Sequence, residues 1–186
     1  MPGIMQLANA HIPSPTSVEV DAKSLPALAE AWAGQPMERM RHALGDAFFM
    51  QLRAQGEEVP TQGFLRTVNY EGSAANDGGL LSEGKIYAVR PTGRCPFPNF
   101  VSIGRTRNND VVLPDLSISK FHAFLRPDHG CYKIQDAGSQ NGTWIGDQRM
   151  TGKEALAMVP GLVLRLGAVQ LTYLDAAGLH QVLRRV

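Results

Sequence analysis

The feature that most constrains the fold of this chain is a series of short apolar segments that starts near residue 84, with turn signals between them about every 8–12 residues. The clearest turn signals are Pro91-Thr92-Gly93, Asn108-Asn109-Asp110, Asp128-His129-Gly130 and Gly146-Asp147. This spacing is typical of an all-β sandwich or barrel. The segments expected to be strands are Lys85–Arg90, Phe100–Arg105, Asp110–Leu113, Ala123–Arg126, Tyr132–Asp136, Thr143–Ile145, Val163–Leu166 and Val169–Leu174.

The first 79 residues lack this regular series. Residues 1–22 contain three prolines and a Ser/Thr cluster, which favours a flexible arm. Apolar side chains then recur at helical spacing in two groups, which predict a helical hairpin. The first helix is expected to begin after Ser24, and the second to begin at Pro36 and to end at Gly56. The apolar stripe of the second helix is Met37, Met40, Leu44, Phe48 and Leu52.

A turn or linker signal, Asn76-Asp77-Gly78-Gly79, follows a possible strand within Gly63–Gly72 and marks the main boundary. Residues 1–79 hold five Lys/Arg and nine Asp/Glu, whereas residues 80–186 hold thirteen and eight, and this split in sign supports two segments with different roles. A contact between two copies of the chain through the N-terminal helices stays open. The expected division is 1–22 flexible arm, 23–79 helical N-terminal segment and linker, 80–175 β domain, and 176–186 C-terminal tail, a short helix or a strand.

Composition excludes several classes of protein. Hydrophobic residues make up 44% of the chain, enough to build a core, and the formal net charge of +1 is too small for a protein that coats a polyanion. No stretch approaches 18 consecutive apolar residues, and the N-terminus lacks the pattern of a secretory signal, so we expect a cytoplasmic protein with no membrane span. Cys95 and Cys131 form no CxxC pair, and we expect reduced cysteines in a reducing compartment, although one disulfide is possible.

Three polar clusters occur where predicted strands meet loops. They are Gly104-Arg105, Ser119-Lys120-Phe121-His122 and Asn141-Gly142-Thr143, with 14 residues from Arg105 to Ser119 and 22 from Ser119 to Asn141. In this order and spacing they resemble the GR, SxxH and NGT blocks of the forkhead-associated (FHA) domain family. The segment 161–167 also resembles the closing segment of that family, in which a glycine precedes a strand ending in Leu-Gly. The resemblance covers about residues 82–175.

The resemblance implies both a fold and a function. The fold is a mainly β, FHA-type eleven-stranded β-sandwich, here with an α-helical N-terminal extension. The function is that of a signalling adaptor that binds phosphothreonine peptides in a Ser/Thr kinase pathway, without catalytic activity, cofactor or metal. The implied partner is a phosphothreonine-containing protein, for example a Ser/Thr kinase or its substrate, and neither nucleic acid nor a membrane is expected as a partner.

The matched residues suit phosphothreonine, which brings a charge of about −1.5 to −2 and three acceptor oxygens. Arg105 supplies a planar fork of donors, Ser119 a hydroxyl, and Lys120 a point charge. By resemblance, Asn141 holds the peptide backbone beside the phosphothreonine. Lys120 and Gln140 depart from the family pattern, which often has Arg at the first position and, in some members, a small hydroxyl residue at the second. We expect Lys120 and Gln140 to belong to the phosphopeptide site all the same, and their departures to retune the site rather than remove it.

A second group of residues is expected to shape the loops. By resemblance, His122 is a structural residue that braces the binding loop through hydrogen bonds and not a phosphate ligand or a general base. Gly104 and Gly142 are expected to allow tight turns or positive φ, and Thr143 to brace a loop with its hydroxyl.

Other functions have less support in the sequence. The five histidines are scattered and no HExxH, GxSxG or GxxxxGK[ST] motif occurs, which argues against an enzyme. Nucleic-acid binding has only the basic half of the chain and Arg184-Arg185 behind it. The main alternative is a phosphate-independent FHA-like scaffold subunit of a larger assembly, which Gln140 favours. A further hypothesis is that phosphorylated Thr16, in the acidic arm, folds back onto the basic site.

Overall fold

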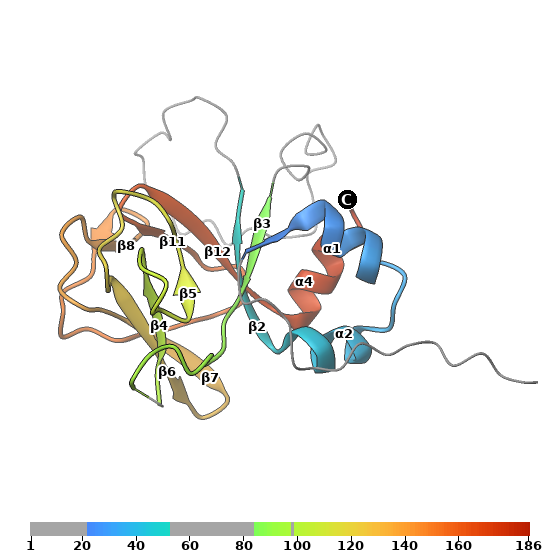
Figure 1. Ribbon diagram of the computed structural model, residues 1–186, viewed down its shortest axis with the longest axis horizontal. Helices are drawn as coiled ribbons and strands as arrows, with labels where there is room; N and C mark the ends of the chain where they lie inside the picture. Colours follow the sequence, from blue (N-terminus) through green and yellow to red (C-terminus); the bar gives the residue numbers. More distant parts are fainter. Residues whose placement is uncertain (1–21, 53–83, 98) are drawn as a thin grey trace, which may run out of the picture.

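The described part of the chain consists of two β-sheets with a group of helices at one end (Figure 1). The structure is a computed structural model, and it describes residues 22–52, 84–97 and 99–186. The flexible arm up to residue 21, Thr16, the possible strand within Gly63–Gly72 and the linker signal Asn76–Gly79 lie outside the described residues. The prediction of a mainly β fold with two packed sheets is confirmed.

The larger sheet has seven strands in the order β1-β3-β2-β12-β11-β8-β9, and every neighbouring pair in it is antiparallel. Its strands are β1 (Lys23–Ser24), β2 (Ala47–Gln51), β3 (Lys85–Ala88), β8 (Thr143–Ile145), β9 (Gln148–Arg149), β11 (Val163–Leu166) and β12 (Val169–Asp175). β12 runs through the middle of the molecule and leads directly into the last helix (Figure 1). This strand therefore connects the sandwich with the helical end.

The smaller sheet has five strands in the order β10-β7-β6-β4-β5. Its strands are β4 (Val101–Gly104), β5 (Val111–Val112), β6 (Ala123–Asp128), β7 (Cys131–Asp136) and β10 (Leu156–Ala157). The pair β4–β5 is parallel and the other pairs are antiparallel. Each of the eight segments expected to be strands overlaps an observed strand, and the twelve strands of the described residues include four that are only two residues long.

The main core lies between the two sheets. Alternate residues of the strands point into it and are almost completely excluded from water, as period-two patterning requires. The most deeply buried members from the two sheets are Phe49, Val101, Ile103, Leu125, Ile134, Leu164, Leu166 and Leu171. This core fixes the strand ends from which the loops described below extend.

The second predicted helix is correct only in its first half. The helix α2 spans Met37–Leu44, and Gly45, with φ +109°, ends it. The chain then enters β2, which pairs with β3 and β12, so the expectation that the helix continues to Gly56 is wrong. Phe49 of this strand faces the main core and Phe48 faces the helices, so β2 is buried on both faces. A strand of this kind is a continuous apolar run, which periodicity cannot distinguish from a buried helix.

The position of β2 also corrects the expected division of the chain. β1 and β2 both come from the segment 23–79, which was expected to be helical, yet both are strands of the seven-stranded sheet. The sandwich therefore draws strands from both sides of the boundary placed near residue 80.

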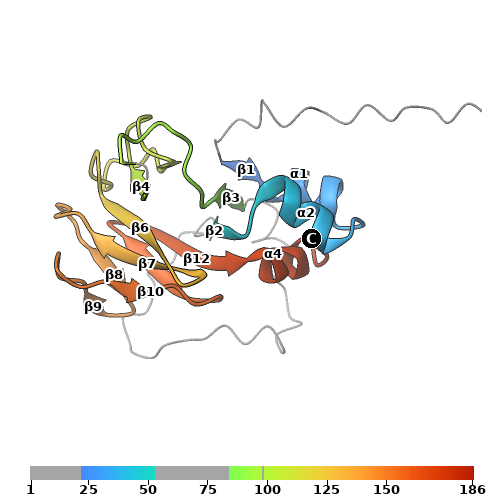
Figure 2. The same ribbon diagram turned by 90° about the horizontal axis from the view of Figure 1, so that it is seen from below.

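A second core forms at the helical end. α1 (Leu25–Trp32) and α2 pack against α4 (Ala176–Leu183) and cover the face of the larger sheet that carries Phe48 and Leu174. Figure 2 shows the three helices together at one end, away from β8 and β9.

Of the two possibilities for the C-terminal tail, the structure has the helix, and the carboxylate of Asp175 caps it by accepting from the Gly178 N–H at 2.7 Å. In the described residues no helix is long and apolar enough to cross a membrane.

Substitution of Phe49 tests the place of β2 in the core. Phe49 is 0% exposed and packs edge-on against Tyr173 at 5.9 Å between ring centroids. We expect Phe49→Ala to lower the free energy of unfolding by about 3–5 kcal/mol, because it leaves a cavity in the core. Urea denaturation measures this, and Phe97→Ala, at a phenylalanine that is 53% exposed, is the matched control with an expected loss below about 1 kcal/mol. Equal small losses would contradict the burial of β2.

Candidate functional site

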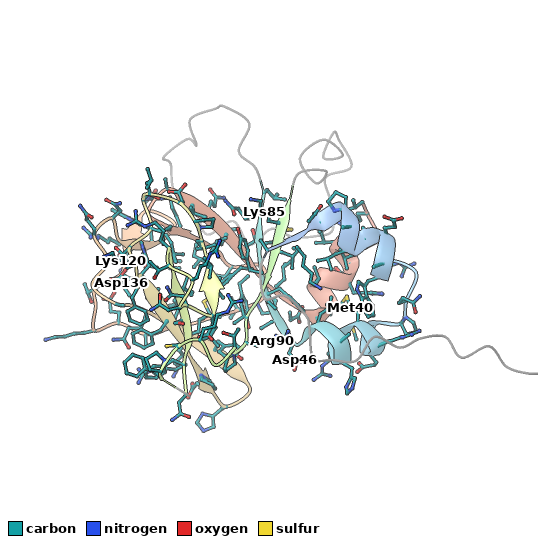
Figure 3. All side chains as sticks on the ribbon, viewed as in Figure 1. Met40, Asp46, Lys85, Arg90, Lys120 and Asp136 are labelled. Atoms are coloured by element: carbon teal, nitrogen blue, oxygen red, sulfur yellow. The ribbon has the colours of Figure 1, made fainter. Side chains whose placement is uncertain are left out.

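The predicted site residues lie in loops at the end of the sandwich remote from the helices. The loops follow β4, precede β6 and connect β7 with β8. Figure 3 shows Lys120 and Asp136 at the opposite end of the molecule from Met40, which lies among the helices. Loops carried on a rigid sandwich can present side chains in a fixed arrangement.

Gly104, the last residue of β4, lets the loop before β6 cross directly over the strand end. A Cβ at this position would overlap the carbonyl oxygen of Lys120 and lie 2.7 Å from Nδ2 of Asn109. Glycine is therefore required here because the backbone at Lys120 passes very close to the strand end. Of the two expected reasons for Gly104, a tight turn or a positive φ, the positive φ does not apply. The Arg105 N–H donates to the Ser119 carbonyl at 3.0 Å, which brings Arg105 beside Ser119 and Lys120.

The backbone at Lys120 is held by two residues that the sequence reasoning missed. Its carbonyl oxygen accepts from Asn109 Nδ2 at 2.7 Å and from Thr106 Oγ1 at 2.9 Å. Asn109 is 1% exposed and also donates to the Thr106 carbonyl at 2.8 Å. In the sequence, Asn109 is part of Asn108-Asn109-Asp110, a pattern that predicts a turn but not a hydrogen bond to a distant carbonyl.

Asp110, also missed, connects the chain before β4 to this strand. Its carboxylate accepts from the N–H and hydroxyl of both Thr92 and Ser102, at 2.7 to 2.9 Å, and it is 1% exposed. Burial raises the pKa of Asp110, but these four hydrogen bonds favour the ionised form, and the net result is a pKa below the usual value. The Asp110 carboxylate is thus ionised and has a structural role, because its oxygens accept hydrogen bonds from other residues of the protein.

His122 connects the two loops that contain the predicted site residues. Its ring is 0% exposed, with Nδ1 accepting from the Ser119 N–H at 3.1 Å and Nε2 donating to the Gly142 carbonyl at 3.2 Å. These partners require a neutral ring with its proton on Nε2. Burial lowers the pKa of His122, against smaller opposing effects of the Gly142 carbonyl and of Asp136. The ring is therefore a fixed bridge between the loops.

Asp136, at the end of β7, organises the loop that leads to Asn141. Its carboxylate accepts from the N–H groups of Gly138 and Ser139 and from the hydroxyls of Ser139 and Thr143, at 2.7 to 2.9 Å. Burial alone would raise its pKa, and the hydrogen bonds reverse this, so that the pKa lies below its usual value. Thr143 is 0% exposed, and its hydroxyl donates to the Asp136 carboxylate. Gly142 has φ +80°, a conformation that side chains rarely adopt.

The two loops meet at Ser119. Its Oγ accepts from the backbone N–H of Gln140 at 3.1 Å, so the hydroxyl proton is free to be donated elsewhere. Asn141 Nδ2 donates to the Ser117 carbonyl at 2.8 Å, which leaves the Asn141 side-chain oxygen as an acceptor. Five residues predicted to bind a phosphopeptide are thereby brought together: Arg105, Ser119, Lys120, Gln140 and Asn141.

The charges of the site are not neutralised within the described part of the chain. Arg105 is half-buried and Lys120 is exposed, and neither forms an ion pair with a described carboxylate. In the same part of the chain no group of three His, Cys, Asp or Glu side chains is placed to hold a metal ion. The site therefore offers two cations, one hydroxyl donor and one free amide oxygen on a rigid backbone.

Cations, a hydroxyl donor and a free amide oxygen at the end of a β-sandwich are groups with the chemistry to contact an anion. Residues 101–167 match the family model described as the FHA domain. The resemblance to this family that was drawn from the three motif blocks is confirmed over these residues.

Several relatives each match a part of this chain. An ABC transporter ATP-binding/permease protein of Mycobacterium tuberculosis is 34% identical over 102 residues, which are 53% of this chain and 11% of the transporter. The oxoglutarate dehydrogenase inhibitor of Corynebacterium glutamicum is 31% identical over 71 residues, 38% of this chain and 48% of the inhibitor. The chain thus spans about half or less of the length of these relatives. A solved structure from a study of phosphothreonine-dependent FHA domain interactions is 20% identical, with a TM-score of 0.43, and the match covers 69% of this chain and 95% of that one.

The buried bridge at His122 predicts a pH dependence of stability. Because the folded-state pKa of His122 lies below the value near 6.5 of an unfolded chain, its contribution is complete above that pH and is lost as the pH falls below it. We expect the free energy of unfolding to decrease from pH 7.5 to 5.5, and the decrease to be smaller in His122→Gln. That variant should also be about 1–3 kcal/mol less stable at pH 7.5.

Urea denaturation at the two pH values measures both effects. The control is His42→Gln, because the His42 side chain is exposed and forms no ion pair with a described residue, and we expect this variant to keep the pH dependence of the original protein. An unaltered dependence in His122→Gln would show that other groups cause it.

Proposed function

We propose that this chain is a phosphothreonine-binding adaptor of a Ser/Thr kinase pathway, acting in the cytoplasm without catalytic activity of its own. The observation that carries the proposal is the arrangement at Ser119. The hydroxyl there is fixed by the Gln140 N–H at 3.1 Å. Arg105, whose N–H donates to the Ser119 carbonyl, and Lys120, the next residue after Ser119, have no acidic partner among the described residues.

This arrangement suits a phosphate ester. The Arg105 guanidinium takes two phosphate oxygens, the Ser119 hydroxyl donates to the third, and the Lys120 ammonium adds a charge without a fixed direction. Each charge-assisted bond contributes about 1.5–3 kcal/mol, and after the cost of ordering the peptide an affinity of about micromolar is expected. Since the backbone at Arg105, Ser119 and Lys120 is held by hydrogen bonds, little of that cost falls on the protein.

The neighbouring amides suit the peptide chain rather than the phosphate. Asn141 keeps its side-chain oxygen free to accept a peptide N–H, because its nitrogen is directed to the Ser117 carbonyl. The exposed side chain of Gln140 stands next to it and offers both a donor and an acceptor. Together they hold the backbone on one side of the phosphothreonine.

The family and its members support the role of an adaptor. The matched relatives include proteins named for regulation, such as the glycogen accumulation regulator of Mycolicibacterium smegmatis, 29% identical over 73 residues. We propose that the partner of this chain is a phosphorylated protein, either a Ser/Thr kinase or a substrate of one. The site is one that binds a modified side chain and releases it unchanged.

Arg105→Ala tests the proposal. We expect it to weaken binding of a phosphothreonine peptide library by about ten- to a hundredfold, because the bidentate contact to the phosphate is lost. The melting temperature should change by less than about 2 °C, since the backbone bond from Arg105 to Ser119 does not depend on the side chain. Calorimetric titration and thermal melting measure the two quantities.

Two comparisons make the test decisive. Arg126→Ala removes a cation from the outer face of β6 and should leave binding unchanged. The unphosphorylated library should not bind the original protein. Equal binding of both libraries would reject the phosphothreonine site and favour a phosphate-independent scaffold, and a large loss of stability in Arg105→Ala would make Arg105 a structural residue.

A further inference from the structure

Next to the proposed phosphate site, the guanidinium of Arg149 lies against the loop that contains Asn141. Arg149 is the last residue of β9, and a Cβ on Gly142 would lie only 2.5 Å from its Nε and 3.1 Å from its Cζ. Its Nη2 reaches the Gln140 carbonyl at 3.4 Å. Gln140 is the residue whose N–H holds the Ser119 hydroxyl, so Arg149 and Ser119 contact opposite ends of one residue.

The aromatic ring of Trp144 holds the side chains of Arg149 and of a second arginine, Arg165, beside this loop. The indole of Trp144, in β8, donates from Nε1 to the Asn141 carbonyl at 3.0 Å. The guanidinium carbon of Arg165 lies 4.6 Å from the centroid of the ring, and that of Arg149 lies 5.9 Å from it. Attraction of a cation to the face of an indole stabilises such positions without neutralising the charge.

No described carboxylate near the site forms an ion pair with these cations. Asp136 is buried and accepts four hydrogen bonds from its own loop, and Asp115 accepts from the N–H and hydroxyl of Ser117 at 2.8 and 2.6 Å. Asp147, in the turn before β9, is exposed, and it forms no ion pair with any described residue. Arg149 and Arg165 are likewise without an ion pair to the described carboxylates.

The site therefore has more positive charge than one phosphate requires. A phosphothreonine, with a charge of about −1.5 to −2, is already matched by Arg105 and Lys120. Arg149 remains as a third cation close to the proposed path of the peptide, which passes Asn141. A peptide with a second anionic group would gain a favourable interaction there that a neutral peptide lacks.

We propose that Arg149 is a specificity-determining residue that binds the carboxylate of an Asp or Glu in the same phosphopeptide. The inference rests on the proposed phosphothreonine site and adds to it a preference for acidic sequences on the side of Asn141. Arg149 and not Arg165 makes this contact. Arg165 is half-buried, and its Nη1 donates to the Gly167 carbonyl at 2.8 Å, whereas Arg149 is exposed and makes one long hydrogen bond. Trp144 and Arg165 are positioning residues.

The test is a phosphothreonine peptide library in which each position flanking the phosphothreonine is varied among Asp, Glu, Asn, Gln and Ala. We expect the original protein to select Asp or Glu at one position, with an affinity about three- to fivefold above the Asn or Gln peptide. Arg149→Gln should remove this selection, so that the acidic phosphopeptides bind no more tightly than their Asn and Gln counterparts. Arg149→Lys, which keeps the charge without the fork, should retain part of the selection.

Arg126→Gln is the matched control, because it changes the net charge equally and lies on the outer face of β6. Loss of acidic selection in this control as well would overturn the inference, since the effect would then be one of overall charge. Selection that survives in Arg149→Gln, or a lack of selection in the original protein, would also overturn it while leaving phosphothreonine binding intact. Failure of every phosphopeptide to bind would overturn both proposals together.

Discussion

The binding end of this molecule depends on one buried imidazole. His122 accepts from the Ser119 N–H and donates to the Gly142 carbonyl, and it does so at 0% exposure, where water cannot replace either partner. The loop before β6 and the loop after β7 are consequently positioned relative to each other by the ring. Under the proposed function, a phosphopeptide that contacts both loops meets groups already in place, which lowers the entropy cost of binding.

Two buried carboxylates, those of Asp110 and Asp136, hold two further segments of the chain in place. Asp110 attaches the chain before β4 to that strand, and Asp136 organises the loop leading to Asn141. A buried charge is costly unless hydrogen bonds compensate it, and each of these accepts four. Because their partners are N–H and hydroxyl groups rather than arginine or lysine, the acids stabilise the loops without neutralising the cations around them. The negative charges that stabilise the loops are therefore not paired with the positive charges proposed to bind the ligand.

The sequence predicted the strands from β3 onward better than it predicted the start of the sandwich. Short strands between strong turn residues, such as β8, emerge from local patterns alone, and the three motif blocks locate the loops. β2 was taken for helix because both of its faces are buried, and no local pattern shows that helices will cover its second face. Asn109 was missed because a buried Asn that holds a distant carbonyl looks the same in sequence as a turn residue.

How a cation is held decides whether it can still bind an anion. An arginine paired with a carboxylate gives up most of its attraction for a ligand, whereas one held by a carbonyl or an aromatic face keeps its full charge. At this site the Lys120 backbone, rather than its ammonium, takes the bonds from Thr106 and Asn109, and Arg165 is held by Trp144 and the Gly167 carbonyl. Arg105, Lys120, Arg149 and Arg165 thus keep their charge unpaired with any described carboxylate near the loops that follow β4, precede β6 and connect β7 with β8.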